Sequence, residues 1–238
     1  MERTPEDPQS TLVSKAMEAF EASFKTLLTA AEIDYLTPHK KRILKSIEWL
    51  GPYIKDDSWI LELGGGMFPY VFHAASPGIR GDNTTTDLRL PLEIPSGQYD
   101  VVVNTELVEH MKDKVEAPYD RFDFSGLRML LSESYRVLKP GGITFVTTPN
   151  ASSLGIIYRI LMEWPHYFFM PHVREYTVKE LKTFLEEQKF SIERMETLDV
   201  YDDLPPNKRE EMTSLLGKGG YSTEYRGECS FVIARKGT

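Results

Sequence analysis

Residues 59–72, WILELGGGMFPYVF, constrain the fold of this chain more than any other stretch. The first five residues form a short, mostly apolar run with one acid, which is typical of a strand buried on both faces of a parallel sheet. Three glycines follow, and they permit a sharp turn and a close approach of a ligand to the backbone. Pro69 then fits the first turn of a helix. A strand, a glycine turn and a helix N-terminus predict an α/β fold with a nucleotide-type ligand site at the carboxyl edge of the sheet.

The kind of ligand is narrowed by what this stretch lacks. A dinucleotide-binding loop needs the pattern Gly-x-Gly-x-x-Gly, but the position three after Gly66 is Pro69. A phosphate-binding P-loop needs a Lys followed by Ser or Thr, and the stretch contains neither pair. A tight turn without a ligand remains the structural alternative for the three glycines alone.

An acid, Glu62, stands two residues before the glycines, and this arrangement resembles the first motif of class I S-adenosylmethionine-dependent methyltransferases. The resemblance implies that Glu62, Gly64, Gly65 and Gly66 hold the amino-acid end of S-adenosylmethionine. The chain departs from the family pattern at Phe68, where the family usually has a third glycine. The glycine loop is therefore the first part of a predicted cofactor site.

Residues 99–111, YDVVVNTELVEHM, resemble a second family segment, "FDvVv…evlEHv". The resemblance implies that Asn104, Thr105 and Glu106 line the methionine end of the cofactor and face the acceptor. Glu109 and His110 are expected to begin the following helix, where the helix dipole favours a carboxylate. For His110 a packed structural role and a catalytic role both remain open.

A third segment, RVLKPGG at residues 136–142, resembles the family's turn before its fifth strand, here residues 143–148. Together the segments extend the resemblance over about residues 59–148. They imply a Rossmann-like, mostly parallel sheet with an N-terminal helical cap. Residues 191–200 and 230–234 are expected to add a C-terminal antiparallel hairpin.

The connection between the first two family segments is short. About twenty residues cannot hold a strand, a helix and another strand, so the sequence predicts a shortened second β-α-β unit. Residues 84–86 are β-branched threonines, and residues 84–87 are interpreted as a strand that ends in an acid. Asp87 is the first candidate for a ribose contact, with Asp82 as the alternate. Asp87 and Leu88 also resemble the family stretch "D-L-x-x-L-P-F" that lies beside the adenine.

The segment at residues 158–176 is crowded with aromatic side chains and is interpreted as a lid or a wall of the acceptor pocket. Its end, HVREYT, resembles a subgroup that methylates small molecules, quinone precursors and sugars. In that subgroup a glycine stands where this chain has Lys189. If the acceptor is a hydroxyl, a histidine has a suitable pKa for a general base. His172 is the first candidate, followed by His110 and His166.

The domain organisation follows from these assignments. Residues 1–55 are expected to form a helical cap, and residues 56–238 a methyltransferase domain that is one structural unit. Inserts are expected at about residues 112–124, 151–176 and 202–227. The last insert is expected either to fold over the site or to form the contact in a homodimer, and the sequence leaves both open.

Composition excludes several classes of function. The net charge is −8, which disfavours nucleic acid as a partner, and the basic cluster Lys40, Lys41 and Arg42 is interpreted as a solvated helix face. No apolar run approaches the length of a membrane helix, so no membrane partner is expected and the cytoplasm is the default location. The single cysteine, Cys229, is interpreted as a small buried hydrophobe. No carboxylate and histidine set has metal-ligand spacing, so no metal is expected.

These observations predict transfer of a methyl group from S-adenosylmethionine to a small-molecule acceptor. The favoured acceptor atom is a hydroxyl of a sugar or secondary metabolite. Three alternatives stay open: an N- or C-methyltransferase, a noncatalytic regulatory protein that binds S-adenosylmethionine, and, less favoured, a dehydrogenase on the same type of sheet.

Overall fold

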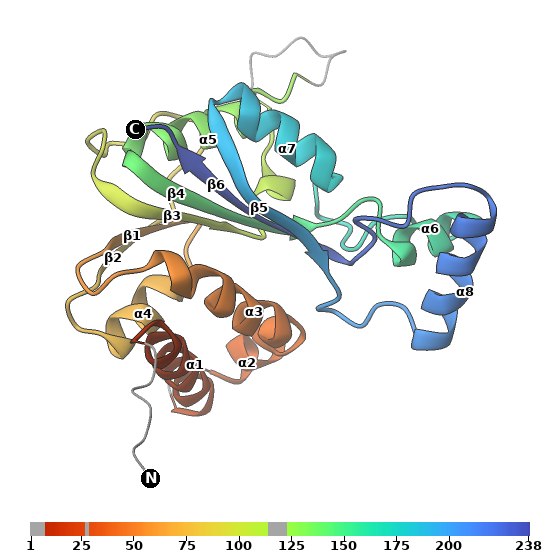
Figure 1. Cartoon of the computed structure of the whole chain (residues 1–238), viewed down its shortest axis with the longest axis horizontal. Coiled ribbons are helices and arrows are strands. Elements are labelled where there is room, and N and C mark those ends of the chain that lie inside the picture. Colours follow the sequence, from red (N-terminus) through yellow and green to blue (C-terminus); the bar gives the residue numbers. More distant parts are fainter. Residues whose placement is uncertain (1–7, 27–28, 114–122) are drawn as a thin grey trace.

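The computed structural model describes residues 8–26, 29–113 and 123–238, and a six-stranded sheet is at its centre (Figure 1). The order across the sheet is β2-β1-β3-β4-β6-β5. The strands are β1 (Trp59–Leu63), β2 (Arg80–Thr84), β3 (Tyr99–Thr105), β4 (Leu138–Pro149), β5 (Phe190–Leu198) and β6 (Cys229–Lys236).

The sheet is parallel through β2, β1, β3 and β4, whereas β6 lies antiparallel between β4 and β5. The predicted Rossmann-like sheet with a C-terminal antiparallel pair is therefore confirmed. The carboxyl ends of β1, β3 and β4 meet at one edge, which is the edge where ligands bind in open α/β sheets.

Helices cover both faces of the sheet (Figure 1). On one face lie α1 (Pro8–Thr26), α2 (Ala30–Leu36), α3 (Lys40–Leu50) and α4 (Phe68–Ala75). On the other lie α5 (Ser125–Val137) and α7 (Val178–Glu187). Short 3-10 turns η1 (Thr37–His39), η2 (Gly51–Tyr53) and η3 (Val108–His110) join some of these elements.

The sheet separates two apolar cores because successive strand residues point to opposite faces. Val101 and Val103 of β3 pack in the core that contains α1, α3 and α4, while Val102 packs in the core that contains α5 and α7. Strands that are buried on both faces read as continuous apolar runs, and β3 is such a strand. This burial holds the carboxyl edge of the sheet in a fixed position.

The second unit is shortened as predicted, since residues 85–98, all of which the structure describes, contain no helix. The predicted strand at residues 84–87 is wrong. β2 runs from Arg80 to Thr84, in parallel register with β1, and Thr84 already pairs with the last residue of that strand. Asp87 therefore lies in the turn beyond the sheet, where Leu90 N donates a hydrogen bond to its carbonyl oxygen at 3.1 Å.

Glu109 and His110 do not begin a helix. They end η3, and the next helix, α5, begins at Ser125. Most of the predicted insert at 112–124 lies outside the described residues. The predicted insert at 202–227 contains α8 (Pro206–Lys218), which packs against α6 (Leu154–Leu161) in a lobe that projects beyond the sheet (Figure 1).

Lys189 shows how a departure from the family pattern is accommodated. It follows α7 with a φ of 68°, the left-handed conformation in which glycine is favoured at a helix end. The backbone has thus kept the conformation although the residue type differs. Within the described part of the chain, no helix has both the length and the apolar character needed to cross a bilayer.

Candidate active site

The glycine loop between β1 and α4 is organised by the Glu62 carboxylate. Glu62 lies in the buried part of β1 with 1% of its surface exposed. Its Oε2 accepts a hydrogen bond of 2.9 Å from the backbone N–H of Phe68, the first residue of α4. Thr105 Oγ1 lies 3.5 Å from Oε1. The acid therefore lies at the positive end of a helix and beside the end of β3.

The loop takes a path that requires glycine. Gly64 and Gly65 have φ values of 85° and 82°, which other residues adopt only at a cost. A Cβ on Gly66 would lie 1.9 Å from Glu62 Oε1. The absence of side chains thus lets the Glu62 carboxylate lie directly beneath the loop, and the backbone of the loop stays exposed to a ligand.

Burial gives Glu62 unusual acid–base behaviour. Removal of its carboxylate from water raises the pKa to about 7, while the Phe68 N–H, the charge on Arg42 and Thr105 act in the opposite direction. A cationic group at the loop would favour the ionised form. A positively charged amino group, such as the one at the amino-acid end of S-adenosylmethionine, is a ligand that fits this environment.

Three neighbouring cavities lie at the carboxyl edge of the sheet. The glycine-loop cavity, about 300 Å³, is lined by Glu62, the three glycines, and Thr105, Glu106 and Leu107. The Asp87 cavity, also about 300 Å³, is lined by Asp87, Leu88 and Met111 among others, and it shares Gly64 and Leu107 with the first. The two cavities together form an elongated site around the glycine loop.

The histidine cavity, about 400 Å³, shares Glu106 with the glycine-loop cavity. Its walls include His39, His110, His172, Phe168 and Tyr201. Glu106 lines both this cavity and the glycine-loop cavity, and His110 lines both this cavity and the Asp87 cavity. A molecule in the histidine cavity would therefore be adjacent to one bound along the glycine loop.

Glu106 is held by groups from four parts of the chain. Tyr201 donates its hydroxyl hydrogen to Oε2, and Thr147 Oγ1 donates to Oε1 at 3.2 Å. Arg42 Nε lies 3.8 Å from Oε1, and Cys229 Sγ lies 3.7 Å from the same atom. The backbone of Glu106 has a φ of 49°, a strained conformation for a non-glycine residue that is common at functional sites.

Arg42 corrects an expectation from the sequence. The sequence predicts that the basic cluster at the start of α3 is a solvated face, but Arg42 is 6% exposed and lines the glycine-loop cavity. Burial opposes its charge, yet Glu106 and other acidic groups outweigh burial and raise its pKa. The signal in the sequence was its position on the face of α3 that also carries Ser46 and Trp49, which are buried.

A second group of side chains, Glu109, His110 and His172, meets in the histidine cavity. Each offers one ligand-type atom, and these atoms lie within 4.8 Å of one another. The rings of His110 and His172 are 4.9 Å apart at 81°. The sequence did not indicate a metal-ligating set because His172 is distant in the chain from the other two, and only the fold brings it to η3.

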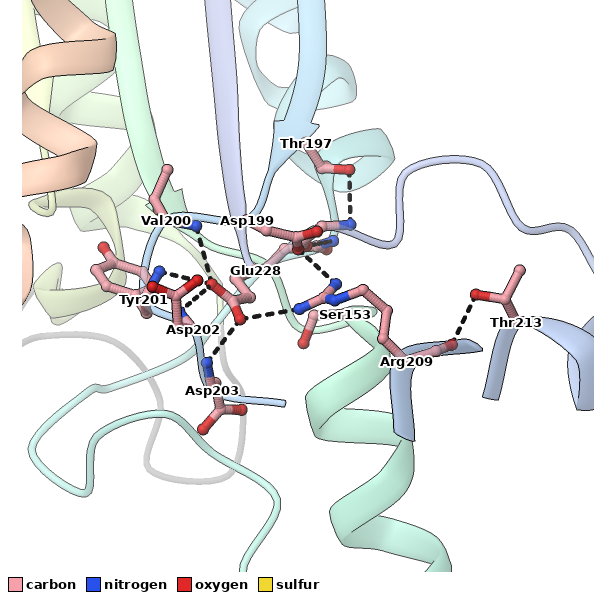
Figure 2. A network of polar contacts seen from close by, with 12 residues as sticks. Ser153, Thr197, Asp199, Val200, Tyr201, Asp202, Asp203, Arg209, Thr213 and Glu228 are labelled. Carbon is pink, nitrogen blue, oxygen red and sulfur yellow. Dashed lines mark hydrogen bonds and ion pairs between the residues drawn. The ribbon is translucent and has the colours of Figure 1, made fainter. Parts of the chain in front are cut away.

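Tyr201 reaches Glu106 because Glu228 organises the loop after β5. The Glu228 carboxylate is fully buried, and the backbone N–H groups of Val200, Tyr201, Asp202 and Asp203 donate to it at 2.6 to 3.0 Å. Arg209 of α8 donates to the same carboxylate at 3.0 Å. Figure 2 shows this carboxylate between the loop and the Arg209 side chain.

The remaining predicted site residues are divided between the site and other locations. Thr105, Glu106, Asp87 and Leu88 line the cavities, as do Glu62 and the glycines. The Asn104 amide instead donates to Thr144 Oγ1 at 3.0 Å within the buried sheet. Asp82 accepts hydrogen bonds from Trp59 Nε1 at 2.7 Å and Tyr99 OH at 2.9 Å. His166 is exposed and lines a different hollow, beside Tyr167 and Met170.

Asp87 faces the Asp87 cavity with its carboxylate already paired. Arg89 donates to both carboxylate oxygens, at 2.9 and 2.7 Å, and these hydrogen bonds lower the pKa of Asp87 to about 2. The carboxylate is therefore ionised at neutral pH. Oδ1 also accepts from the backbone N–H of Arg89 at 3.0 Å, whereas Oδ2 can accept a further hydrogen bond, so the pairing is compatible with a contact to a ribose hydroxyl.

Comparison with known proteins gives the family context. The chain matches the methyltransferase domain family over residues 35–194 of its 238 residues. A protein of Mycolicibacterium smegmatis, described as a probable S-adenosylmethionine-dependent methyltransferase, is 34% identical over 110 residues. That match covers 46% of this chain and 35% of the relative, so the chain spans about a third of the relative's length.

Solved structures show a similar fold. A SAM-dependent methyltransferase from Archaeoglobus fulgidus superposes with a TM-score of 0.58 at 16% identity, covering 87% of this chain and all of the other. A SAM-dependent methyltransferase from Thermotoga maritima gives a TM-score of 0.52 at 15% identity, covering 92% of this chain and 99% of the other. At these identities the similarity shows the shared fold.

Proposed function

The chain belongs to the methyltransferase domain family, and on that premise we propose that it transfers a methyl group from S-adenosylmethionine to a hydroxyl of a small molecule. The observation that carries this proposal is the arrangement of the three cavities. The glycine-loop and Asp87 cavities form one elongated site around Gly64, and the histidine cavity joins it at Glu106. Donor and acceptor would therefore lie next to each other.

The residues of the elongated site fit the cofactor. Glu62 supplies a buried carboxylate for the amino group, and the exposed backbone of Gly64 and Gly65 permits close approach. Asp87 supplies an ionised carboxylate for ribose hydroxyls, with the apolar side chain of Leu88 next to it in the same cavity. When bound, S-adenosylmethionine supplies an electrophilic methyl group on a sulfonium.

The chain's own task is to align the acceptor and to manage one proton. The hydroxyl oxygen of an acceptor in the histidine cavity would receive the methyl group that the cofactor supplies when bound. The hydroxyl proton passes to a base. Burial and the neighbouring His172 lower the pKa of His110, so its ring is neutral and able to accept a proton. Glu175 lies 2.7 Å from His172 Nδ1 and favours the tautomer whose Nε2 is a proton acceptor.

The histidine cavity supports a small acceptor. Its volume, about 400 Å³, is within the usual range for small-molecule sites. Phe168, Phe169 and Tyr201 give it aromatic walls, and Glu106 and Glu109 give it acidic groups. Such walls suit a neutral or cationic metabolite, for example a sugar or another polyhydroxylated compound.

Titration calorimetry with S-adenosylmethionine, S-adenosylhomocysteine and NAD tests the first half of the proposal. We expect binding of the first two at about micromolar affinity and none of NAD. Glu62→Ala should abolish binding, because it removes the carboxylate and the cap of α4. The exposed Glu93→Ala serves as the control and should bind like the wild type. Unchanged affinity in Glu62→Ala would refute the assigned site.

A methyl-transfer assay over a panel of hydroxylated and amine-containing small molecules tests the second half. Turnover of a hydroxyl acceptor supports the proposal. Turnover of amines alone would replace it with N-methylation. Cofactor binding without turnover of any acceptor would favour a regulatory protein.

A further inference from the structure

We propose that Glu109, His110 and His172 form a binding site for a divalent transition-metal cation in the wall of the histidine cavity. One carboxylate oxygen and two imidazole nitrogens converge there, within 4.8 Å of one another. The site would be open on the side of the cavity, which all three residues line. It goes beyond the proposed function and depends on that function only for its role in catalysis.

The backbone fixes the three side chains relative to one another. Glu109 and His110 are consecutive residues of η3, which follows the buried strand β3 after two residues. The Glu109 carbonyl oxygen accepts hydrogen bonds from the N–H groups of Val173, at 2.8 Å, and Arg174, at 3.2 Å. These bonds join the segment that carries His172 to η3. The convergence is therefore built into the fold and does not depend on the long side chains alone.

The Glu109 carboxylate gives an independent sign of a missing ligand. It is fully buried, and Thr148 Oγ1 donates to Oε2 at 2.8 Å. Oε1 has no hydrogen-bond partner among the described residues. A buried carboxylate oxygen without a partner is costly, and a cation bound to it would compensate that cost.

His172 is arranged as a metal-ligating histidine usually is. Ligating histidines commonly use one ring nitrogen for the metal and the other for a carboxylate or carbonyl. Glu175 lies 2.7 Å from His172 Nδ1, which leaves Nε2 for the cation. Imidazole binds a metal ion in its neutral form. Zinc bonds of about 2.0–2.2 Å would draw the ligand atoms somewhat closer, and the exposed ring of His110 has room to move.

The donor set indicates which cations fit. Two imidazoles and one carboxylate suit Zn²⁺, Co²⁺, Mn²⁺ or Fe²⁺ better than Mg²⁺ or Ca²⁺, which prefer oxygen ligands. Glu106 faces the same cavity and adds negative charge, although Tyr201 and Thr147 already occupy its oxygens. Arg42 is the opposing charge, and it lies on the Glu106 side, 3.8 Å from that carboxylate.

Three protein ligands leave coordination positions for an acceptor. An acceptor hydroxyl that binds the cation loses its proton more readily, and the resulting oxygen can attack the methyl group. The proton would then leave to solvent, and His110 and His172 would act as ligands in place of bases. One nitrogen cannot hold a cation and accept a proton at once, so the two roles can be separated by measuring metal binding directly.

The experiment uses chelator-treated full-length protein with Co²⁺ or Zn²⁺ alone. We expect one Co²⁺ per chain, with visible absorption bands of a nitrogen- and oxygen-ligated ion, and one Zn²⁺ by titration calorimetry. His110→Ala, a change at an exposed side chain, should weaken Zn²⁺ binding by at least the roughly 10- to 100-fold that loss of an outer-shell partner costs, since it removes one of three ligands. Glu109→Gln should do the same while it preserves volume. His166→Ala removes a histidine outside the group and should leave binding unchanged.

Two results would overturn the site: no saturable binding of Co²⁺ or Zn²⁺ to the wild type, or equal affinity in His110→Ala and the wild type. Binding of S-adenosylhomocysteine, measured on the same samples, checks that each variant is folded. It also separates the two proposals. Metal binding without cofactor binding would leave the metal site standing and refute the methyltransferase function, whereas the reverse result would refute only the metal site.

Discussion

The glycine-loop cavity and the histidine cavity share Glu106 in their walls, yet they are built differently. Most of the wall of the glycine-loop cavity comes from residues 62–68 and 105–107, the ends of two adjacent strands. The wall of the histidine cavity comes from five separate stretches of the chain, at residues 34–39, 106–110, 149, 168–172 and 201. One cavity is encoded locally, and the other is assembled by the fold.

This difference has a physical basis. A loop that must pass close to a ligand depends on backbone conformation, and conformations such as those of Gly64 and Gly65 restrict which residues can occupy the positions. A cavity assembled from distant segments depends on how those segments pack, and many sequences can satisfy the packing. The first kind of site therefore leaves a motif in the sequence, and the second does not.

The largest effect is expected from a substitution that disrupts the loop that places Tyr201 in the histidine cavity. Glu228→Gln replaces a buried carboxylate that accepts four backbone hydrogen bonds and pairs with Arg209. Loss of a buried charged partner typically costs 3–5 kcal/mol, so we expect about that decrease in unfolding free energy in urea denaturation. Because the loop places Tyr201 in the histidine cavity, affinity for S-adenosylhomocysteine should change much less than stability does.

The exposed Glu224→Gln, in the loop before β6, is the control and should leave stability unchanged within about 0.5 kcal/mol. If Glu228→Gln were as stable as the wild type, the network in Figure 2 would not be what holds this loop.

The second effect concerns the glycine-loop cavity and depends on the ionisation of Glu62 beneath the loop. Burial raises the pKa of Glu62 from 4.5 to about 7, so the folded protein holds this proton more tightly than the unfolded chain does. The protonated carboxyl group of Glu62 therefore stabilises the folded protein. This stabilisation is fully present below about pH 4.5 and is lost as the pH rises through about 7. Relative to Glu62→Gln, the ligand-free wild type should lose about 3 kcal/mol between pH 4.5 and 8.

Urea denaturation of both proteins at several pH values measures this difference. An unfolding free-energy difference that stays constant with pH would contradict the raised pKa of Glu62. The exposed Glu93→Gln should follow the wild type at every pH.

The smallest effect is expected when one methyl group is added to the glycine loop. Gly64→Ala and Gly97→Ala both place a side chain at a positive φ, 85° and 67°, so each pays a similar conformational cost of about 1–2 kcal/mol. Only Gly64 lines the cavities, and its Cβ would lie 3.0 Å from Leu107 Cδ1. We expect Gly64→Ala to weaken S-adenosylhomocysteine binding about tenfold to 100-fold in calorimetry, and Gly97→Ala to leave it unchanged.

Equal losses of affinity in the two glycine variants would show that general strain, and not the site, determines binding.

The sequence also predicted the sheet and its shortened second unit, because strands such as β3 are buried on both faces and read as apolar runs. It placed Asp87 at the end of a strand, whereas the register between β1 and β2 ends the strand at Thr84. Register depends on the neighbouring strand, and that information is not local. The sequence likewise predicts that Asn104 and Asp82 contact the cofactor. Asn104 instead donates a hydrogen bond to Thr144. Asp82 accepts hydrogen bonds from Trp59 and Tyr99, so both side chains are directed away from the cavities.

By itself, the sequence determined the α/β class, the glycine loop and the acid beneath it, because those features depend on backbone freedom and on the alternation of buried residues along short stretches. Only the tertiary structure decided that Arg42 and Tyr201 meet Glu106 and that His172 meets Glu109 and His110. Those contacts join residues that are far apart in the chain, and their geometry is fixed by the packing of helices and loops around the sheet.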